Sequence, residues 1–327
     1  MLPTFFSPAL FEVPRGYVEP IVQYLRLANT TLDFLFYDVN AFRADLSKLG
    51  WDVEVDEWPL DPSGLTRLLK HLDLSALSNP EGAILVVDAA ERPYVKAFRS
   101  VAKFLDDDAG TKIGTISITG VGSSALGSAA FAWNLSTALG KPVAAIVPGY
   151  GVADVIQQAL GGWFGFEMYS YWIKQPVQDV LANTQPQVAS IGRALLATTP
   201  GHKKATTGAP VFRSGSGSSD VLHAILKSSD RPMHVFGHSK GALVIANAIL
   251  DLPAPILAKL SVVTFGCSVS ESARVGSYEQ FLGVFDLLGI INSGGNAAEH
   301  LVDTWHSTNT EMPYTMHVAS LSRTLQS

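Results

Sequence analysis

Residues 233–247 read MHVFGHSKGALVIAN, and the order of residue types predicts a strand, a sharp turn and a helix. At the turn, Gly237-His238-Ser239-Lys240-Gly241 matches the pattern G-x-S-x-G. Glycines on both sides of a serine let the strand and the helix approach each other around a strained turn. The pattern therefore predicts Ser239 as a nucleophile above the end of a strand. The alternative is a glycine-rich turn with a solvent-exposed serine.

The same turn predicts half of an oxyanion hole. The backbone N–H of Lys240, next after the serine, would point to the anion position at the helix N-terminus. A second N–H is expected from the small residues of Thr119–Ser124, and we assign it to Val121 or Gly122. The rival is the turn at 148–151, which follows the next strand.

Strand and helix patterns alternate on both sides of this turn. Short apolar runs predict buried strands, and the alanine-rich segment Ala125–Leu139 predicts a helix between two of them. The expected strands are Gly82–Ala90, Ile113–Thr119, Pro142–Val147 and Leu260–Phe265. Strands and helices at this spacing indicate parallel βαβ units, and hence an α/β fold with a doubly wound, mostly parallel sheet.

The first hundred residues show weaker patterns. Thr31–Val39 is rich in strand-forming residues, and Trp51–Trp58 alternates apolar and acidic side chains at its start, so both predict strands. Asp61-Pro62 resembles a helix start, which predicts an amphipathic helix through Leu77. Tyr94–Leu105 has helical periodicity.

The alternation stops over residues 151–219, which predicts a cap or lid inserted into the sheet domain. Residues 1–150 would then form the N-terminal part of the sheet, and residues 220–327 the C-terminal part with the catalytic groups. The insertion carries an aromatic cluster, which we expect to be an apolar wall over the site or, alternatively, the packing core of the cap. Its main members are Trp163, Phe164, Phe166 and Tyr169.

The turn at 237–241, followed by Thr264-Phe265-Gly266 at the end of the next strand, resembles the α/β-hydrolase lipases, in particular the class 3 pattern G-H-S-x-G then T-F-G. The order of elements is similar from residue 113 to the C-terminus. Ala242 stands where that family has a further glycine. Cys267-Ser268 stands where Pro-Arg often follows. The resemblance implies an α/β-hydrolase fold and a Ser-His-acid triad without metal or cofactor.

In that superfamily the acid and the histidine follow the serine along the chain, each after a strand. Asp286 follows the strand-like residues Phe281–Phe285, and we prefer it to Asp251 and Asp303 as the acid. Its alternative role is a helix N-cap.

For the base we prefer His306, which follows the expected strand Leu301–Trp305 and precedes a turn and the last helix, from about Pro313. The competitors are His317, within that helix, and His300, at the start of the strand. His238, beside the serine, is expected to be structural.

Composition excludes several other classes. The formal net charge is −6 and basic residues are scattered, so nucleic-acid binding has no electrostatic basis. Cys267 is the single cysteine and leaves no internal disulfide. No histidine pair has the H-E-x-x-H spacing of a zinc site. The start lacks the basic region of a secretory signal, and apolar runs stop short of the ~20 residues that span a bilayer. We expect a cytoplasmic location.

These features together predict a lipase or carboxylesterase that acts on a small-molecule or lipid ester with an apolar acyl group, with contact to a lipid interface as an option. Two alternatives stay open from sequence. One is an acyltransferase or polyester depolymerase on the same fold. The other is a non-catalytic binding protein of that fold.

Overall fold

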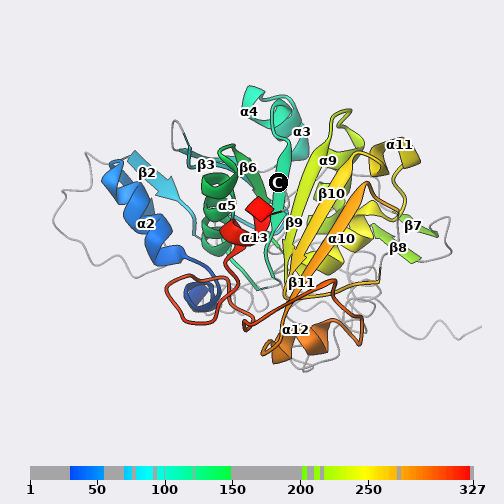
Figure 1. Cartoon of the computed structure of the whole chain (residues 1–327). Coiled ribbons are helices and arrows are strands. Elements are labelled where there is room, and N and C mark those ends of the chain that lie inside the picture. Colours follow the sequence, from blue (N-terminus) through cyan, green and yellow to red (C-terminus); the bar gives the residue numbers. More distant parts are fainter. Residues whose placement is uncertain are drawn as a thin grey trace, which may run out of the picture.

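The structure is a computed structural model, and it describes residues 30–54, 70–75, 79–90, 94–98, 100–120, 122–148, 201–204, 210–213, 217–270 and 274–324. Within these ranges eight strands form one sheet, in the order β12-β11-β10-β9-β5-β6-β3-β4 (Figure 1). The strands are β3 (Ile84–Asp88), β4 (Tyr94–Phe98), β5 (Thr115–Ile118), β6 (Val143–Ile146), β9 (Met233–His238), β10 (Leu260–Phe265), β11 (Ser277–Gly283) and β12 (His300–Val302).

All neighbours in this sheet are parallel except β3, which is antiparallel to both β4 and β6. The predicted α/β class with a mostly parallel sheet is confirmed. Two small pairs lie outside the sheet: β1 (Trp51–Glu54) with β2 (Lys70–Asp73), and β7 (Gly201–Lys204) with β8 (Pro210–Arg213).

Helices cover both faces of the sheet (Figure 1). One apolar core packs between one face and α5, α2 and α13, and the other between the opposite face and α9, α10 and α3. The helices are α2 (Val39–Lys48), α3 (Val101–Leu105), α4 (Asp108–Thr111), α5 (Ala125–Leu139), α9 (Ser218–Lys227), α10 (Gly241–Ile249), α11 (Ala254–Leu257), α12 (Leu287–Asn292) and α13 (Val318–Thr324).

The central strands bury side chains on both faces, which explains their continuous apolar runs. In β3, Leu85 and Val87 belong to one core, whereas Ile84 and Val86 belong to the other. Helix α5 begins at the N-cap Ser124 and ends before Gly140 in the left-handed conformation, as its sequence pattern predicts.

The predicted strand Thr31–Val39 is wrong, because residues 30–36 are helical and α2 begins at Val39. Thr30, Asp33 and Tyr37 are buried. Their spacing of three and four residues places them on one face of a helix, whereas the run of apolar and aromatic residues fits either element. Tertiary packing therefore overrides the β propensity.

Three other elements differ from the sequence prediction. Residues 70–73 form β2, not the end of a helix from Asp61, whose other residues lie mostly outside the described ranges. Tyr94–Phe98 is the edge strand β4, and only Val101–Leu105 of that predicted helix is helical. The terminal helix begins at Val318 rather than near Pro313. Each element is short, so too few residues are available to establish a period.

Strands from residues 84–146 and from residues 233–302 share one sheet. Of the predicted insertion 151–219, only 201–204, 210–213 and 217–219 lie inside the described residues. The aromatic residues Trp163, Phe164, Phe166 and Tyr169 lie outside them.

Candidate functional site

Ser239 sits on a strained turn between β9 and α10. Its φ is +54°, in the left-handed region that residues with a side chain rarely occupy. A side chain on Gly241 would place Cβ 2.4 Å from the carbonyl oxygen of Ile118, and one on Gly237 would place Cβ 2.7 Å from Cδ1 of Ile245. The backbone of β5 therefore excludes a side chain at Gly241, whereas a side chain at Gly237 would have to displace the end of the Ile245 side chain.

The backbone around Ser239 is fixed by neighbouring strand ends. Its N–H donates to the carbonyl oxygen of Phe265 at 2.7 Å, which ties the turn to the end of β10. On the other side lies Gly120, where an added Cβ would be 3.1 Å from Cβ of Ser239. Ser239 is thus enclosed between the ends of β10 and β5, with 7% of its surface exposed.

Asp286 and His306 form a buried pair. Nδ1 of His306 lies 2.9 Å from Oδ1 and 2.8 Å from Oδ2 of Asp286. Asp286 is also the N-cap of α12, because Oδ1 accepts a hydrogen bond from the Gly289 N–H at 2.6 Å. Asp286 therefore caps α12, and the same carboxylate contacts the histidine predicted as the base.

Gly266 explains the glycine of the T-F-G pattern. It adopts a φ of +67°, and an added Cβ would lie 3.0 Å from Nδ1 of His306 and 3.2 Å from Oδ2 of Asp286. A side chain there would push the imidazole and the carboxylate apart. The end of β10 therefore leaves room for the pair beside the serine turn.

The competing acids and histidines lie elsewhere. Asp251 faces His223, with 3.4 Å between Oδ1 and Nδ1. Asp303 and His317 are exposed, and His300 pairs with Glu279. Of the candidates weighed, the structure brings together Asp286 and His306.

His306 packs against His238, the residue before Ser239. The centroids of the two imidazole rings are 4.9 Å apart. Among the described residues, the Ser239 hydroxyl makes no hydrogen bond to His306 in this structure. Serine–histidine hydrogen bonds of catalytic sites are often long before substrate binds and shorten in the complex.

The predicted oxyanion donors belong to the turns that follow β9 and β5. Lys240 is the N-cap of α10, so its backbone lies at the positive end of that helix. Gly122 has a φ of +101° in the turn that precedes α5. Val121 and residues 149–151 of the rival turn lie outside the described residues.

Comparisons with models of known protein families, with curated proteins and with solved structures find no match to this chain.

Two buried groups that sequence reasoning missed lie against the site. The Tyr37 hydroxyl is hydrogen-bonded to Nδ1 of His238 and accepts a hydrogen bond from the Gly120 N–H. Asp33 accepts from the N–H and the hydroxyl of Ser124 and from the Gly127 N–H, at the start of α5. The sequence signal for these two residues was their spacing of four, which places them on one face only if the segment is a helix.

Burial controls the electrostatics around the pair. It lowers the pKa of His238 to about 3, and the neighbouring His306 acts in the same direction, so His238 is neutral near pH 7. Burial and the charge of Asp286 raise the pKa of the Cys267 thiol to about 12. Cys267 is therefore protonated near pH 7 and cannot serve as a nucleophile.

Burial also raises the pKa of Asp33 to about 7, although hydrogen bonds from Ser124 and Gly127 oppose the shift. Between about pH 4 and 7 the folded chain then holds a proton on Asp33 that the unfolded chain has lost, so the stability due to this group falls as pH rises. We expect the free energy of unfolding of the wild type, minus that of Asp33→Asn, to fall by about 1 kcal/mol per pH unit over this window.

Urea unfolding of both proteins at pH 4.5, 5.5 and 6.5 measures that difference, in which the other titrating groups cancel. A difference that stays flat or rises with pH would contradict a raised pKa of Asp33. It would mean that the three donated hydrogen bonds outweigh burial.

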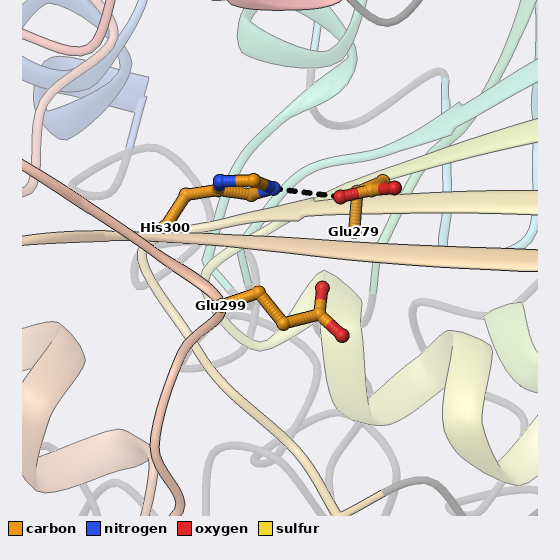
Figure 2. Close-up of side chains that lie close together, drawn as sticks. All are labelled: Glu279, Glu299 and His300. Atoms are coloured by element: carbon orange, nitrogen blue, oxygen red, sulfur yellow. Dashed lines mark hydrogen bonds and ion pairs between the residues drawn. The ribbon is translucent and has the colours of Figure 1, made fainter.

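One group of described residues offers ligand atoms for a metal ion: Glu279, Glu299 and His300 (Figure 2). Each of the three side chains has a partner within the protein. Nε2 of His300 lies 2.6 Å from Oε2 of Glu279, and its ring stacks on Phe281. Glu299 accepts a hydrogen bond from the Gln280 N–H. Glu279 of β11 and His300 of β12 are partly exposed, and Glu299, which precedes β12, is exposed.

Within the described residues, no helix combines the length and the apolar character needed to cross a bilayer.

Proposed function

We propose that this chain is a serine ester hydrolase of the α/β-hydrolase fold. The observation that carries the proposal is the buried pair of Asp286 and His306 beside Ser239, which is itself held at a positive φ. The three residues follow β9, β11 and β12 in the chain order Ser, acid, His. That order, each residue at the carboxyl end of a parallel strand, is the arrangement expected of this superfamily.

In the proposed mechanism, Ser239 Oγ attacks the ester carbonyl carbon while its proton passes to Nε2 of His306. Asp286 holds Nδ1–H and stabilises the imidazolium that forms. The N–H of Lys240 and one N–H of the 119–124 loop stabilise the tetrahedral oxyanion. Collapse expels the alcohol, which takes the proton from His306. Water then repeats the sequence on the acyl-enzyme, releasing the carboxylic acid and free Ser239.

An apolar acyl group is supported by the surface beside the acid. Phe285 and Leu287, on either side of Asp286, are 65% and 69% exposed. Ile290 and Ile291 of α12 are also exposed, and this helix carries no charged residue. Exposed apolar side chains gathered at the rim of a site are typical of surfaces that contact apolar ligands.

The test is hydrolysis of p-nitrophenyl esters from acetyl to palmitoyl by the wild-type chain. We expect release of p-nitrophenol, with kcat/KM higher for a medium or long acyl chain than for acetyl, because burial of each CH₂ contributes up to about 0.8 kcal/mol. A folded protein that hydrolyses no ester of any length would contradict the proposal. Activity confined to acetyl would contradict the apolar acyl group.

A further inference from the structure

A chain of buried hydrogen bonds crosses the site behind the proposed triad. Tyr37 Oη lies 2.9 Å from Nδ1 of His238, and Nε2 of His238 lies 2.9 Å from the carbonyl oxygen of His306. The Tyr37 oxygen also accepts from the Gly120 N–H at 3.0 Å and from the Ser123 hydroxyl at 3.1 Å. Three segments far apart in sequence therefore meet at one hydroxyl.

The positions of the protons follow from the partners. A carbonyl oxygen can only accept, so Nε2 of His238 must carry the proton that it donates to His306. The buried ring is neutral near pH 7, which leaves a lone pair on Nδ1 to accept the Tyr37 hydroxyl proton. Tyr37 has one proton to give, and its lone pairs receive those of Gly120 and Ser123. Each donor and acceptor in the chain is thus used once in a defined direction.

The loop that carries His306 is bound by the same helical segment as Tyr37. The carbonyl oxygens in the last turn of a helix have no partner within the helix. At the end of helix 30–36 these oxygens accept hydrogen bonds from the loop. The bonds join Asn309 Nδ2 to Phe34 (2.7 Å), Ser307 Oγ to Leu35 (2.7 Å), and Thr308 N and Oγ1 to Phe36 (3.0 and 2.8 Å). In Figure 1 the red loop before α13 encircles the short dark-blue helix.

We propose that Tyr37 is a positioning residue for this site, fixing the His306 backbone through His238 and the Gly120 loop directly. The proposal rests on the proposed function, because it assigns Tyr37 a role in that reaction. Tyr37 is 2% exposed and packs edge-on against the His238 ring, with centroids 5.4 Å apart, so it does not contact substrate. Its effect passes to His306, which moves the proton, and to the loop expected to supply an oxyanion donor.

Tyr37→Phe removes the hydroxyl and keeps the ring. It takes away the hydrogen-bond partners of His238 Nδ1 and of the Gly120 N–H, so the His306 backbone and the loop lose their common anchor. Misplacement of a catalytic group by about 1 Å can cost about 100-fold in rate. We therefore expect kcat for the best p-nitrophenyl ester to fall about 10- to 100-fold, with KM changed by less than about two-fold, because the acyl surface is untouched.

The control is Tyr278→Phe, since Tyr278 is a buried tyrosine near the start of β11, at the opposite end of that strand from Asp286. Both variants are compared at a temperature where each is folded by circular dichroism. We expect the control to retain wild-type kcat. A Tyr37→Phe protein that loses thermal stability but retains wild-type kcat would overturn the proposal and leave Tyr37 a structural residue. A fall in kcat for both variants would also overturn it.

A second readout does not depend on activity. Long-range ¹H–¹⁵N spectra, with the His238 signals assigned from a His238→Gln variant, report which ring nitrogen carries the proton. We expect a neutral ring protonated on Nε2 in the wild type, and a shifted Nδ1 resonance in Tyr37→Phe. Protonation on Nδ1 would overturn the hydrogen-bond chain whether or not esters are hydrolysed. With the expected tautomer and no ester hydrolysis in the wild type, the proposed function fails, and the positioning role of Tyr37 in that reaction fails with it.

Discussion

Ser239→Ala is expected to lower kcat for the best ester substrate by on the order of 10⁶-fold, the size of effect measured when a triad nucleophile is removed. The Cys267 thiol cannot replace it, because this thiol is buried and its pKa is raised. Stability should change little. The Ser239 side chain makes no hydrogen bond among the described residues, and alanine removes only one oxygen.

The matched control is Ser219→Ala. Ser219 is also 7% exposed, but it lies in α9, where its hydroxyl accepts a hydrogen bond from Asn247. Its loss should leave kcat/KM unchanged. Ester hydrolysis by purified Ser239→Ala at more than about one hundredth of the wild-type rate would exclude Ser239 as the nucleophile.

Asp286→Asn is expected to lower kcat by about 10⁴-fold, as for the corresponding change in a serine protease. Asparagine can keep the N-cap of α12, because its amide oxygen can still accept from the Gly289 N–H. It cannot hold Nδ1–H of His306 with both oxygens or balance the imidazolium charge. The substitution thus removes the catalytic role and preserves the structural one.

Asp251→Asn is the control, since Asp251 pairs with a different histidine, His223, and follows α10 rather than β11. Steady-state kinetics and thermal denaturation of both variants separate activity from folding. If both variants had the same kcat, or if Asp286→Asn lost activity only in proportion to unfolded protein, Asp286 would be no more than a helix cap.

The sequence is most informative where a pattern persists over many residues or where chemistry restricts the residue type. Ala125–Leu139 and Leu260–Phe265 have the predicted bounds, because helix caps and a continuous buried run mark their ends. The glycines of the G-x-S-x-G turn are predictable from sterics alone. Asp286 and His306 could be placed by their order after strands, and the structure brings them into contact.

Residues 31–39 show what the sequence could not supply. Their composition predicts a strand, whereas residues 30–36 are helical, because Asp33 accepts hydrogen bonds at the start of α5 and Tyr37 reaches His238, 201 residues away. A short apolar run fits either element, and its long-range partners decide between them. The same holds for β4, where five residues are too few to show a period.

Covalent capture by a fluorophosphonate ester tests whether Ser239 is an activated nucleophile without the need for a known substrate. Intact-mass measurement followed by peptide mapping should find one phosphonyl adduct on Ser239 in the folded wild type. The Ser239→Ala protein should carry none. A folded wild type that gains no adduct, or gains it on another residue, would show that Ser239 is not the activated nucleophile.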